Sequence, residues 1–228
     1  MSLSTDPPRD CPLCPRLVEF RQMWRAREPD WHNGPVETWC DEAGRDAVRL
    51  LIVGLAPGVR GANRTGRPFT GDYAGDLLYA TLTEYGFASG SYGADPQDNL
   101  RLKRTAITNA VRCVPPENKP VAAEINTCRQ YLYATVNSFP GLEMIVTLGK
   151  IAHDSTLRAL GVRVGSAPFS HGGVHEVAAP IGSVRLLSSY HCSRYNTNTG
   201  RLTETMFRSV FERARELLGP QSGQVTAR

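Results

Sequence analysis

Four short apolar segments constrain the fold more than any other feature of this sequence. They occupy residues 49–55, 105–111, 144–148 and 184–189. Each is rich in branched side chains and ends at Gly, Pro or polar residues, a pattern typical of parallel strands buried on both faces. Helical patterns alternate with them, at residues 15–27, 73–85, 121–138, 150–160 and 202–218. This alternation predicts an α/β fold with three α/β/α layers around a central, mostly parallel four-stranded sheet.

The length of 228 residues fits one large domain. We expect this domain to cover residues 1–219, and residues 220–228 to form a flexible tail. Residues 163–178 place Pro and Gly-Gly between short β-like runs, which indicates a hairpin or a long loop. The longest apolar run is about ten residues, whereas a membrane span needs roughly twenty. The N-terminus has no basic-then-apolar signal pattern, so we expect a cytoplasmic protein without membrane contact.

The segments that follow the four strands are the candidate sites of chemistry, because ligands of such sheets bind beyond the carboxyl ends of the strands. These segments are residues 54–72, 109–113, the turn at Gly149 and residues 190–203. The first is Gly-rich, but its GLAPG run is neither the dinucleotide GxGxxG motif nor a Walker loop. The sequence therefore gives no indication of nicotinamide, flavin or P-loop nucleotide chemistry.

The net charge of +4 arises from 26 basic and 22 acidic residues, and 23 of the basic residues are Arg. Arg suits bidentate contacts with phosphate. The codon bias of a GC-rich genome explains the count equally well, and composition alone cannot place charges on a surface. Placement along the chain is more informative: residues 101–112 and 191–203 each carry basic residues and no acidic one. Both segments adjoin the candidate site loops.

The six cysteines include four with spacing typical of a metal or cluster site. Cys11 and Cys14 form a CxxC pair, and Cys113 and Cys128 are separated by 14 residues. Four thiolates can hold an iron–sulfur cluster or a zinc ion, and spacing does not separate the two. Unrelated buried thiols are a further alternative, because free cysteines are often buried. The remaining two cysteines are predicted to be free thiols.

Three elements of the sequence together resemble the uracil-DNA glycosylase superfamily. They are the loop GLAPGVRGANRTGRPFTGD at residues 54–72, Asn109 on the second strand, and His191 after the fourth. The closer resemblance is to family 5, the type B enzymes with an iron–sulfur cluster. It covers nearly the whole chain, from Cys11 to the helix after Thr203. The stretches NRTGRPFTGD and NTNTGRLT are its most specific parts, and the cysteine layout is similar to that of families 4 and 5.

The resemblance implies a monofunctional DNA glycosylase that hydrolyses the N-glycosidic bond of uracil in DNA and initiates base excision repair. It also implies activity on other deaminated bases such as hypoxanthine. The implied partner is DNA containing these bases, and we expect a monomer at the nucleoid. A structural 4Fe-4S cluster is implied at Cys11, Cys14, Cys113 and Cys128, with zinc the less favoured occupant. No Lys is placed to form a Schiff base, so lyase activity is not expected.

Four side chains carry the implied reaction. Phe69 offers an aromatic surface for a base flipped out of the duplex, and the Asn109 amide can both donate to and accept from the uracil edge. His191 can hydrogen-bond the charge that develops on the leaving base. Asp72 can stabilise the oxocarbenium-like sugar and orient water. Two alternatives stay open: Asp72 could only cap the following helix, and Asn109 could only bond the backbone at its strand end.

The resemblance also implies further contacts. The base pocket would comprise Gly54, Ala56, Pro57, Gly58, Phe69, Asn109 and His191. DNA contacts would come from Arg64, Arg67, Ser193, Arg194, Tyr195 and Arg201. Arg194 or Tyr195 would fill the space left by the flipped nucleotide. The sequence departs from better-known relatives at Ala56, where they carry an acidic or amide residue, and at Cys192, where many carry Pro.

A second class of function is compatible with the same residues. In this alternative the protein is a non-catalytic iron–sulfur or zinc module that binds nucleic acid or senses redox state. A uracil-containing duplex separates the two hypotheses, because only the enzyme leaves an abasic site that alkali cleaves.

Overall fold

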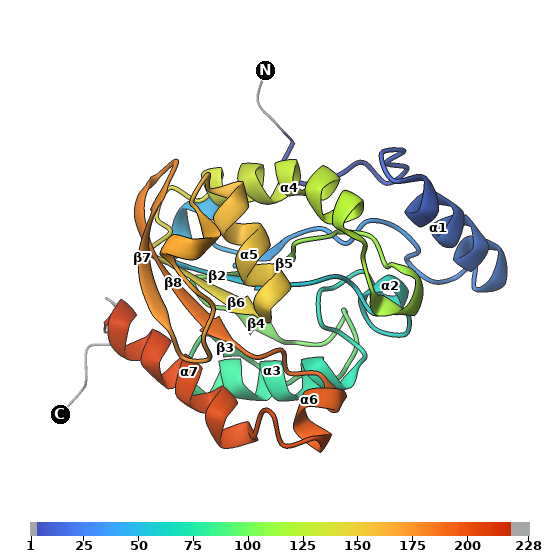
Figure 1. Cartoon of the computed structure of the whole chain (residues 1–228). Helices are drawn as coiled ribbons and strands as arrows, with labels where there is room; N and C mark the ends of the chain where they lie inside the picture. The colour runs from blue at the N-terminus through green and yellow to red at the C-terminus, as the bar shows by residue number, and fades with distance from the viewer. Residues whose placement is uncertain (1–3, 220–228) are drawn as a thin grey trace.

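A six-stranded sheet with the strand order β1-β5-β2-β6-β8-β7 lies at the centre of the molecule. The computed structural model describes residues 4–219 and shows this sheet between two layers of helices (Figure 1). Four strands are parallel to one another: β5 (Thr105–Asn109), β2 (Leu50–Gly54), β6 (Met144–Leu148) and β8 (Gly182–Ser189). They lie at the four apolar segments of the sequence, which confirms the prediction of a three-layer α/β fold with a mostly parallel sheet.

The sheet has two more strands than the four predicted. β1 (Trp39–Cys40) and β7 (Val174–Ala179) are antiparallel strands at its two edges. β1 is two residues long, which is too short to show a hydrophobic pattern. β7 pairs with β8 in a hairpin whose turn lies at residues 180–181, beyond the segment 163–178 that was predicted to form a hairpin or a long loop; that segment contains a loop followed by most of β7. Most of its side chains are exposed or half-buried, so β7 lacks the continuous apolar run that marks a central strand.

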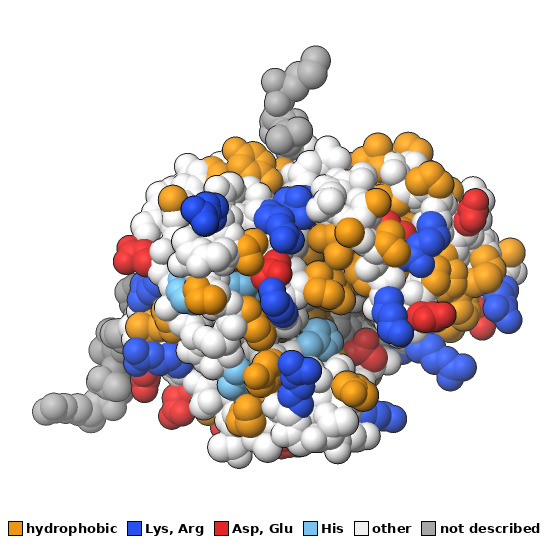
Figure 2. Space-filling model, viewed as in Figure 1, with side chains coloured by type: hydrophobic (Ala, Val, Ile, Leu, Met, Phe, Trp, Pro, Cys, Tyr) orange, Lys and Arg blue, Asp and Glu red, His pale blue; other side chains and the backbone are white. Residues whose placement is uncertain are grey.

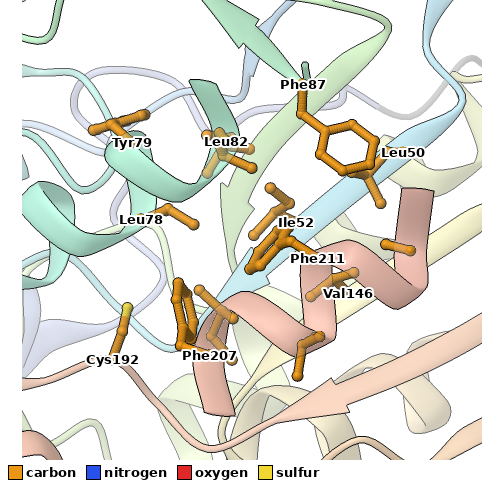
Figure 3. Packing of buried hydrophobic residues seen from close by; sticks show 14 of the residues in the cluster. Leu50, Ile52, Leu78, Tyr79, Leu82, Phe87, Val146, Cys192, Phe207 and Phe211 are labelled. Atoms are coloured by element: carbon orange, nitrogen blue, oxygen red, sulfur yellow. The ribbon is translucent and has the colours of Figure 1, made fainter. Parts of the chain in front are cut away.

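Helices cover both faces of the sheet (Figure 1). α3 (Tyr73–Glu84) and α7 (Glu204–Leu218) pack on one face, and α4 (Ala122–Asn137) and α5 (Lys150–Ala159) on the other. Because successive side chains of a strand point to opposite faces, Ile52 joins the first core and Leu51 the second. Figure 3 shows Phe207 and Phe211 of α7 near Ile52 in the first core. Each such side chain contributes about 1.5–3 kcal/mol on burial.

Further elements lie around these layers. They are α1 (Pro15–Arg27), α2 (Ala62–Thr65), α6 (Arg194–Asn198), β3 (Ala88–Ser89) and β4 (Arg101–Leu102). α1 has the predicted bounds. The sequence analysis did not predict α2 and α6, because helices of four and five residues are too short to show a helical period.

Ion pairs tie the N-terminal arm, by which we mean the described residues up to the end of α1, to the rest of the molecule. The fully buried Arg112, three residues after β5, donates to Asp6 Oδ1 at 2.6 Å. Arg16 donates to both carboxylate oxygens of Glu124 on α4, at 2.7 and 2.8 Å. Loss of one partner of a buried pair costs about 3–5 kcal/mol, so the Arg112 pair holds the arm firmly beside the sheet.

Two predictions concern the limits of the chain. The predicted flexible tail, residues 220–228, lies outside the described residues. Among residues 4–219, no helix is long and apolar enough to cross a membrane.

Candidate active site

A cavity of about 370 Å³ opens at the carboxyl ends of β2, β5 and β8. Its walls come from the loop after β2, the end of β5 and the loop after β8. They include nine of the residues predicted for the site: Ala56, Pro57, Gly58, Phe69, Asp72, Asn109, His191, Ser193 and Arg194. Figure 2 shows a hollow where α2, α3 and α6 meet, with Lys and Arg side chains around it. A cavity of this volume can hold a small molecule such as a nucleobase.

Asn109 and Phe69 meet above Gly54, the last residue of β2. A Cβ at Gly54 would lie 2.4 Å from Asn109 Oδ1 and 2.5 Å from Phe69 Cζ, so only glycine fits there. Asn109 is 3% exposed, and its Oδ1 has no hydrogen-bond partner. The alternative that this oxygen bonds the backbone at the strand end is therefore wrong. A buried amide oxygen without a partner is costly in an empty protein, which points to a polar group of a ligand.

His191 also lines the cavity, from the loop after β8. Its ring centroid lies 6.2 Å from that of Phe69, with 30° between the planes. Burial lowers the pKa of His191 to about 4, so the imidazole is neutral at neutral pH. Two contacts hold its loop: Asn196 Nδ2 donates to the His191 carbonyl at 2.8 Å, and the buried Cys192 thiol lies 3.5 Å from the Ala74 carbonyl. Cys192 therefore anchors this loop through its side chain, at the position where the resemblance places Pro in many relatives.

Asp72 caps helix α3 and also lines the cavity, so its place is compatible with both roles considered from the sequence. Its Oδ1 accepts from the Gly75 N–H at 3.3 Å and caps α3. Its Oδ2 faces Gly58 and Gly61, where added Cβ atoms would lie 3.0 and 2.4 Å away. Burial raises the pKa of Asp72 above the usual range, against the lowering effect of N–H groups at the start of α3. The carboxyl group therefore caps a helix and also lines the cavity.

The family follows from this sequence and site together. Residues 42–215 match the family model of the uracil DNA glycosylase superfamily. This chain belongs to that superfamily. It is 43% identical over 215 residues to the type-5 uracil-DNA glycosylase of Thermus thermophilus, covering 92% of this chain and 94% of the relative.

Other relatives of this superfamily member carry matching names. A type-5 uracil-DNA glycosylase of Mycobacterium tuberculosis is 43% identical over 218 residues, covering 92% of this chain and 78% of the relative. A type-4 enzyme of Archaeoglobus fulgidus is 27% identical over 172 residues, covering 75% of this chain and 78% of the relative. The resemblance predicted from the motifs is therefore confirmed.

Sequence reasoning missed several residues that line the cavity of this superfamily member. They are Leu55, Ala62, Tyr73, Ala74 and Asn118. Asn118 is the most informative, because it comes from the segment between Cys113 and Cys128. Its φ is 56°, in the left-handed region that Asn tolerates better than most residues. The Pro-Pro-Glu-Asn run at 115–118 was the available signal for such a turn.

The residues predicted to touch DNA fall into two groups. Arg64, Arg194, Tyr195 and Arg201 are exposed, and Tyr195 is 73% exposed. The guanidinium of Arg194 lies 5.2 Å from the ring centre of Tyr73 at the cavity.

Arg67 contradicts its predicted role as a phosphate contact. Its side chain is 6% exposed, and its two terminal nitrogens donate to the Asp98 carboxylate, each at 2.7 Å. Its Nε donates to Thr70 Oγ1 at 2.8 Å. The guanidinium is thus occupied inside the protein and is not presented to a nucleic acid.

The four predicted ligand cysteines line a second cavity, together with Arg21 and Tyr131. Burial raises the pKa of Cys113 to about 12 and that of Cys128 to about 11 when no metal is present. Within residues 4–219, no group of three or more His, Cys, Asp or Glu side chains is arranged to hold a metal ion. The four thiols share one largely apolar cavity.

Proposed function

We propose that this protein excises uracil from DNA by hydrolysing the N-glycosidic bond. One observation carries the proposal: the buried, unpartnered Oδ1 of Asn109 lies beside the Phe69 ring, in a cavity that also contains His191. An amide next to an aromatic face suits the edge and the face of a pyrimidine. The relatives named uracil-DNA glycosylases support the same reaction.

The proposed reaction begins with a base flipped out of the duplex. Uracil stacks on Phe69, while Asn109 accepts from its N3–H and donates to its O4. As the bond between C1′ and N1 breaks, the electron pair leaves with the base and the sugar becomes oxocarbenium-like. Water adds its hydroxyl group to C1′, and its proton goes to Asp72 or to solvent. The products are an abasic site and, once the uracil anion is protonated, free uracil.

The electrostatics of two side chains support these roles. The neutral imidazole that follows from the lowered pKa of His191 can donate an N–H to the developing charge on O2. The raised pKa of Asp72 makes its carboxylate a better proton acceptor for the attacking water.

The proposal extends to other deaminated bases such as hypoxanthine. Ala56 lines the cavity with a single methyl group, at the position where better-known relatives were expected to carry a larger polar residue. The space beside it supports entry of a larger base.

We further propose that Cys11, Cys14, Cys113 and Cys128 hold a structural 4Fe-4S cluster. The chemistry of the donor set fits, because four thiols and the buried guanidinium of Arg21 surround one cavity. A zinc ion would draw all four sulfur atoms to about 2.3 Å from one point. A cluster of four irons would keep its ligands farther apart, and the similarity of the cysteine layout to that of families 4 and 5 supports the cluster. The cluster would link the N-terminal arm to α4 and supply no step of the reaction.

The remaining expectations belong to the same proposal. DNA would be bound by the exposed Arg64 and Arg201 on phosphates, and by the half-buried Ser193 with the exposed Arg194 and Tyr195 at the groove. We also expect a monomer that forms a single domain over residues 1–219. Such an enzyme would work in the cytoplasm, at the nucleoid.

The decisive experiment incubates the protein with an end-labelled duplex that contains one uracil. We expect alkali to cleave the strand at the uracil, and a matched thymine duplex to stay intact. Asn109→Ala is the internal control and should bind the duplex while losing most of the cleavage. Tight binding of wild-type protein with no abasic product would contradict the proposal and favour the non-catalytic alternative. Iron and acid-labile sulfide in the purified protein would support the cluster, and stoichiometric zinc would contradict it.

A further inference from the structure

The turn that carries Phe69 is held by a segment outside the cavity. Phe69 has a φ of 52° and Gly71 a φ of 94°. A left-handed backbone is strained at Phe69, because its Cβ crowds the neighbouring carbonyl. Such a conformation persists only where surrounding contacts impose it. Part of these contacts comes from residues 90–100, between β3 and β4.

The Tyr92 hydroxyl makes hydrogen bonds on both sides of Thr70. It accepts from the Gly71 N–H at 3.0 Å and donates to the Phe69 carbonyl at 3.4 Å. Helix α3 packs closely against the same carbonyl, since a Cβ at Gly75 would lie 1.7 Å from that oxygen and 2.7 Å from the Tyr92 hydroxyl. The turn is therefore held by the backbone of α3 together with one phenolic oxygen.

Other contacts fix the place of Tyr92 itself. Asp98 accepts from two N–H groups of its own segment, at 2.8 and 3.1 Å, and holds Arg67 with both carboxylate oxygens. The Arg67 guanidinium lies 5.8 Å from the centre of the Tyr92 ring, and the Tyr79 ring lies 4.6 Å from it. The segment that carries Tyr92 is thus bound to the start of the turn that Tyr92 clamps.

We propose that Tyr92 is a positioning residue for base excision. Its hydroxyl keeps Phe69 in the backbone conformation that brings the ring over Gly54 and beside Asn109. Tyr92 is not among the described residues that line the cavity, so it acts through Phe69 and not on the base. The inference rests on the proposed function, because uracil excision is the reaction by which it is measured.

The test removes the hydroxyl and keeps the ring, as Tyr92→Phe. We expect single-turnover excision of uracil at saturating enzyme to fall about tenfold, the effect of losing one well-placed hydrogen-bonding group. Binding to a duplex with a stable abasic analogue should change less than about twofold, because no base enters the pocket. Tyr133→Phe, on α4 at the opposite face of the sheet, is the matched control and should leave both quantities unchanged.

A double-mutant cycle separates positioning from a general structural effect. If Tyr92 acts through Phe69, the double variant Tyr92→Phe with Phe69→Leu is no slower than Phe69→Leu alone. A further tenfold loss in the double variant would overturn the inference. So would a wild-type excision rate for Tyr92→Phe.

Two outcomes need separate measurements. If Tyr92→Phe is unfolded at the assay temperature, its rate is measured at a lower temperature at which circular dichroism shows it to be folded. The same loss relative to wild type at that temperature is expected, and a wild-type rate overturns the inference. If wild-type protein excises no uracil, the proposed function has failed. A crystal structure of Tyr92→Phe then decides the inference directly: loss of the positive φ at Phe69 supports it, and an unchanged turn overturns it.

Discussion

The wall of the cavity formed by residues 67–72 is buried and braced, whereas the wall formed by residues 190–199 is largely open to solvent. In the first, Arg67 and Phe69 are buried and receive side-chain contacts from residues 92 and 98. In the second, helix α6 has no buried residue and carries the exposed Tyr195. We call these the base wall and the DNA wall.

The difference matches what each wall would recognise in the proposed function. A nucleobase is small and rigid, so a surface that already has the right shape binds it without an ordering cost. A DNA backbone is long and deformable, and exposed side chains at a rim can follow it. His191 belongs to the DNA wall by sequence, yet Asn196 and Cys192 anchor it as firmly as a residue of the base wall.

The largest expected effect separates two arginines, one from each wall. Arg67→Met should lower the free energy of unfolding by about 3–5 kcal/mol, because it leaves the Asp98 carboxylate buried and unpaired. Arg194→Met should change it by at most about 0.5 kcal/mol, since Arg194 is exposed. Urea unfolding curves of the two variants provide the measurement. If Arg67→Met and Arg194→Met lower the free energy of unfolding equally, the two walls do not differ in how firmly they are held.

His191→Ala should lower kcat/KM for uracil excision by about 10²–10³, the usual cost of removing a donor to developing negative charge. Affinity for an abasic product duplex should change much less. Single-turnover rates and fluorescence anisotropy measure the two quantities. A rate within about threefold of wild type would mean that His191 only shapes the loop.

Gly54→Ala should lower the excision rate by about 100-fold, because the added methyl group displaces Asn109 and Phe69 from their places. Gly165→Ala is the matched control, since a Cβ there has nothing within 4 Å. The rate on a uracil duplex is measured for both variants. Near-normal excision by Gly54→Ala would show that Phe69 and Asn109 can move aside without loss of activity, and would contradict the view that the base wall is rigid.

The last expected effect concerns pH and stability. Burial lowers the pKa of His191 to about 4 in the folded protein, whereas an unfolded histidine titrates near about 6.5. Between these values the unfolded state binds more protons, so the burial of this group lowers the free energy of unfolding progressively as the pH falls from about 6.5 to about 4. His191→Gln should therefore lose less stability than wild type between pH 7 and pH 4, as followed by urea unfolding. If the free energy of unfolding falls with pH equally in wild type and in His191→Gln, His191 is not buried in a neutral form.

The central strands could be predicted because their burial on both faces leaves continuous apolar runs in the sequence. β1 and β7 could not be predicted as sheet strands in the same way, because an edge strand is short or half polar. The grouping of Asn109 and His191 followed from the rule that parallel strands bring their carboxyl ends together.

Arg67 and Asn118 show where sequence reasoning ends. Arg67 lies in a polar, Gly-rich loop, which suggested an exposed phosphate contact, but its partner Asp98 is 31 residues away in the chain. Asn118 reaches the cavity from the segment between two cysteines, and no local pattern reveals that this segment folds back to the strand ends. Both depend on contacts between distant segments, which local periodicity does not encode.

The missing side chain at Gly54 has a consequence for how this protein can evolve. The space above this residue is already filled by the two groups that would hold a base. Replacement of Gly54 by a larger residue therefore cannot make room for a different damaged base. Any change of preference has to arise at the rim, at positions such as Ala56, where a new side chain finds room in the cavity itself.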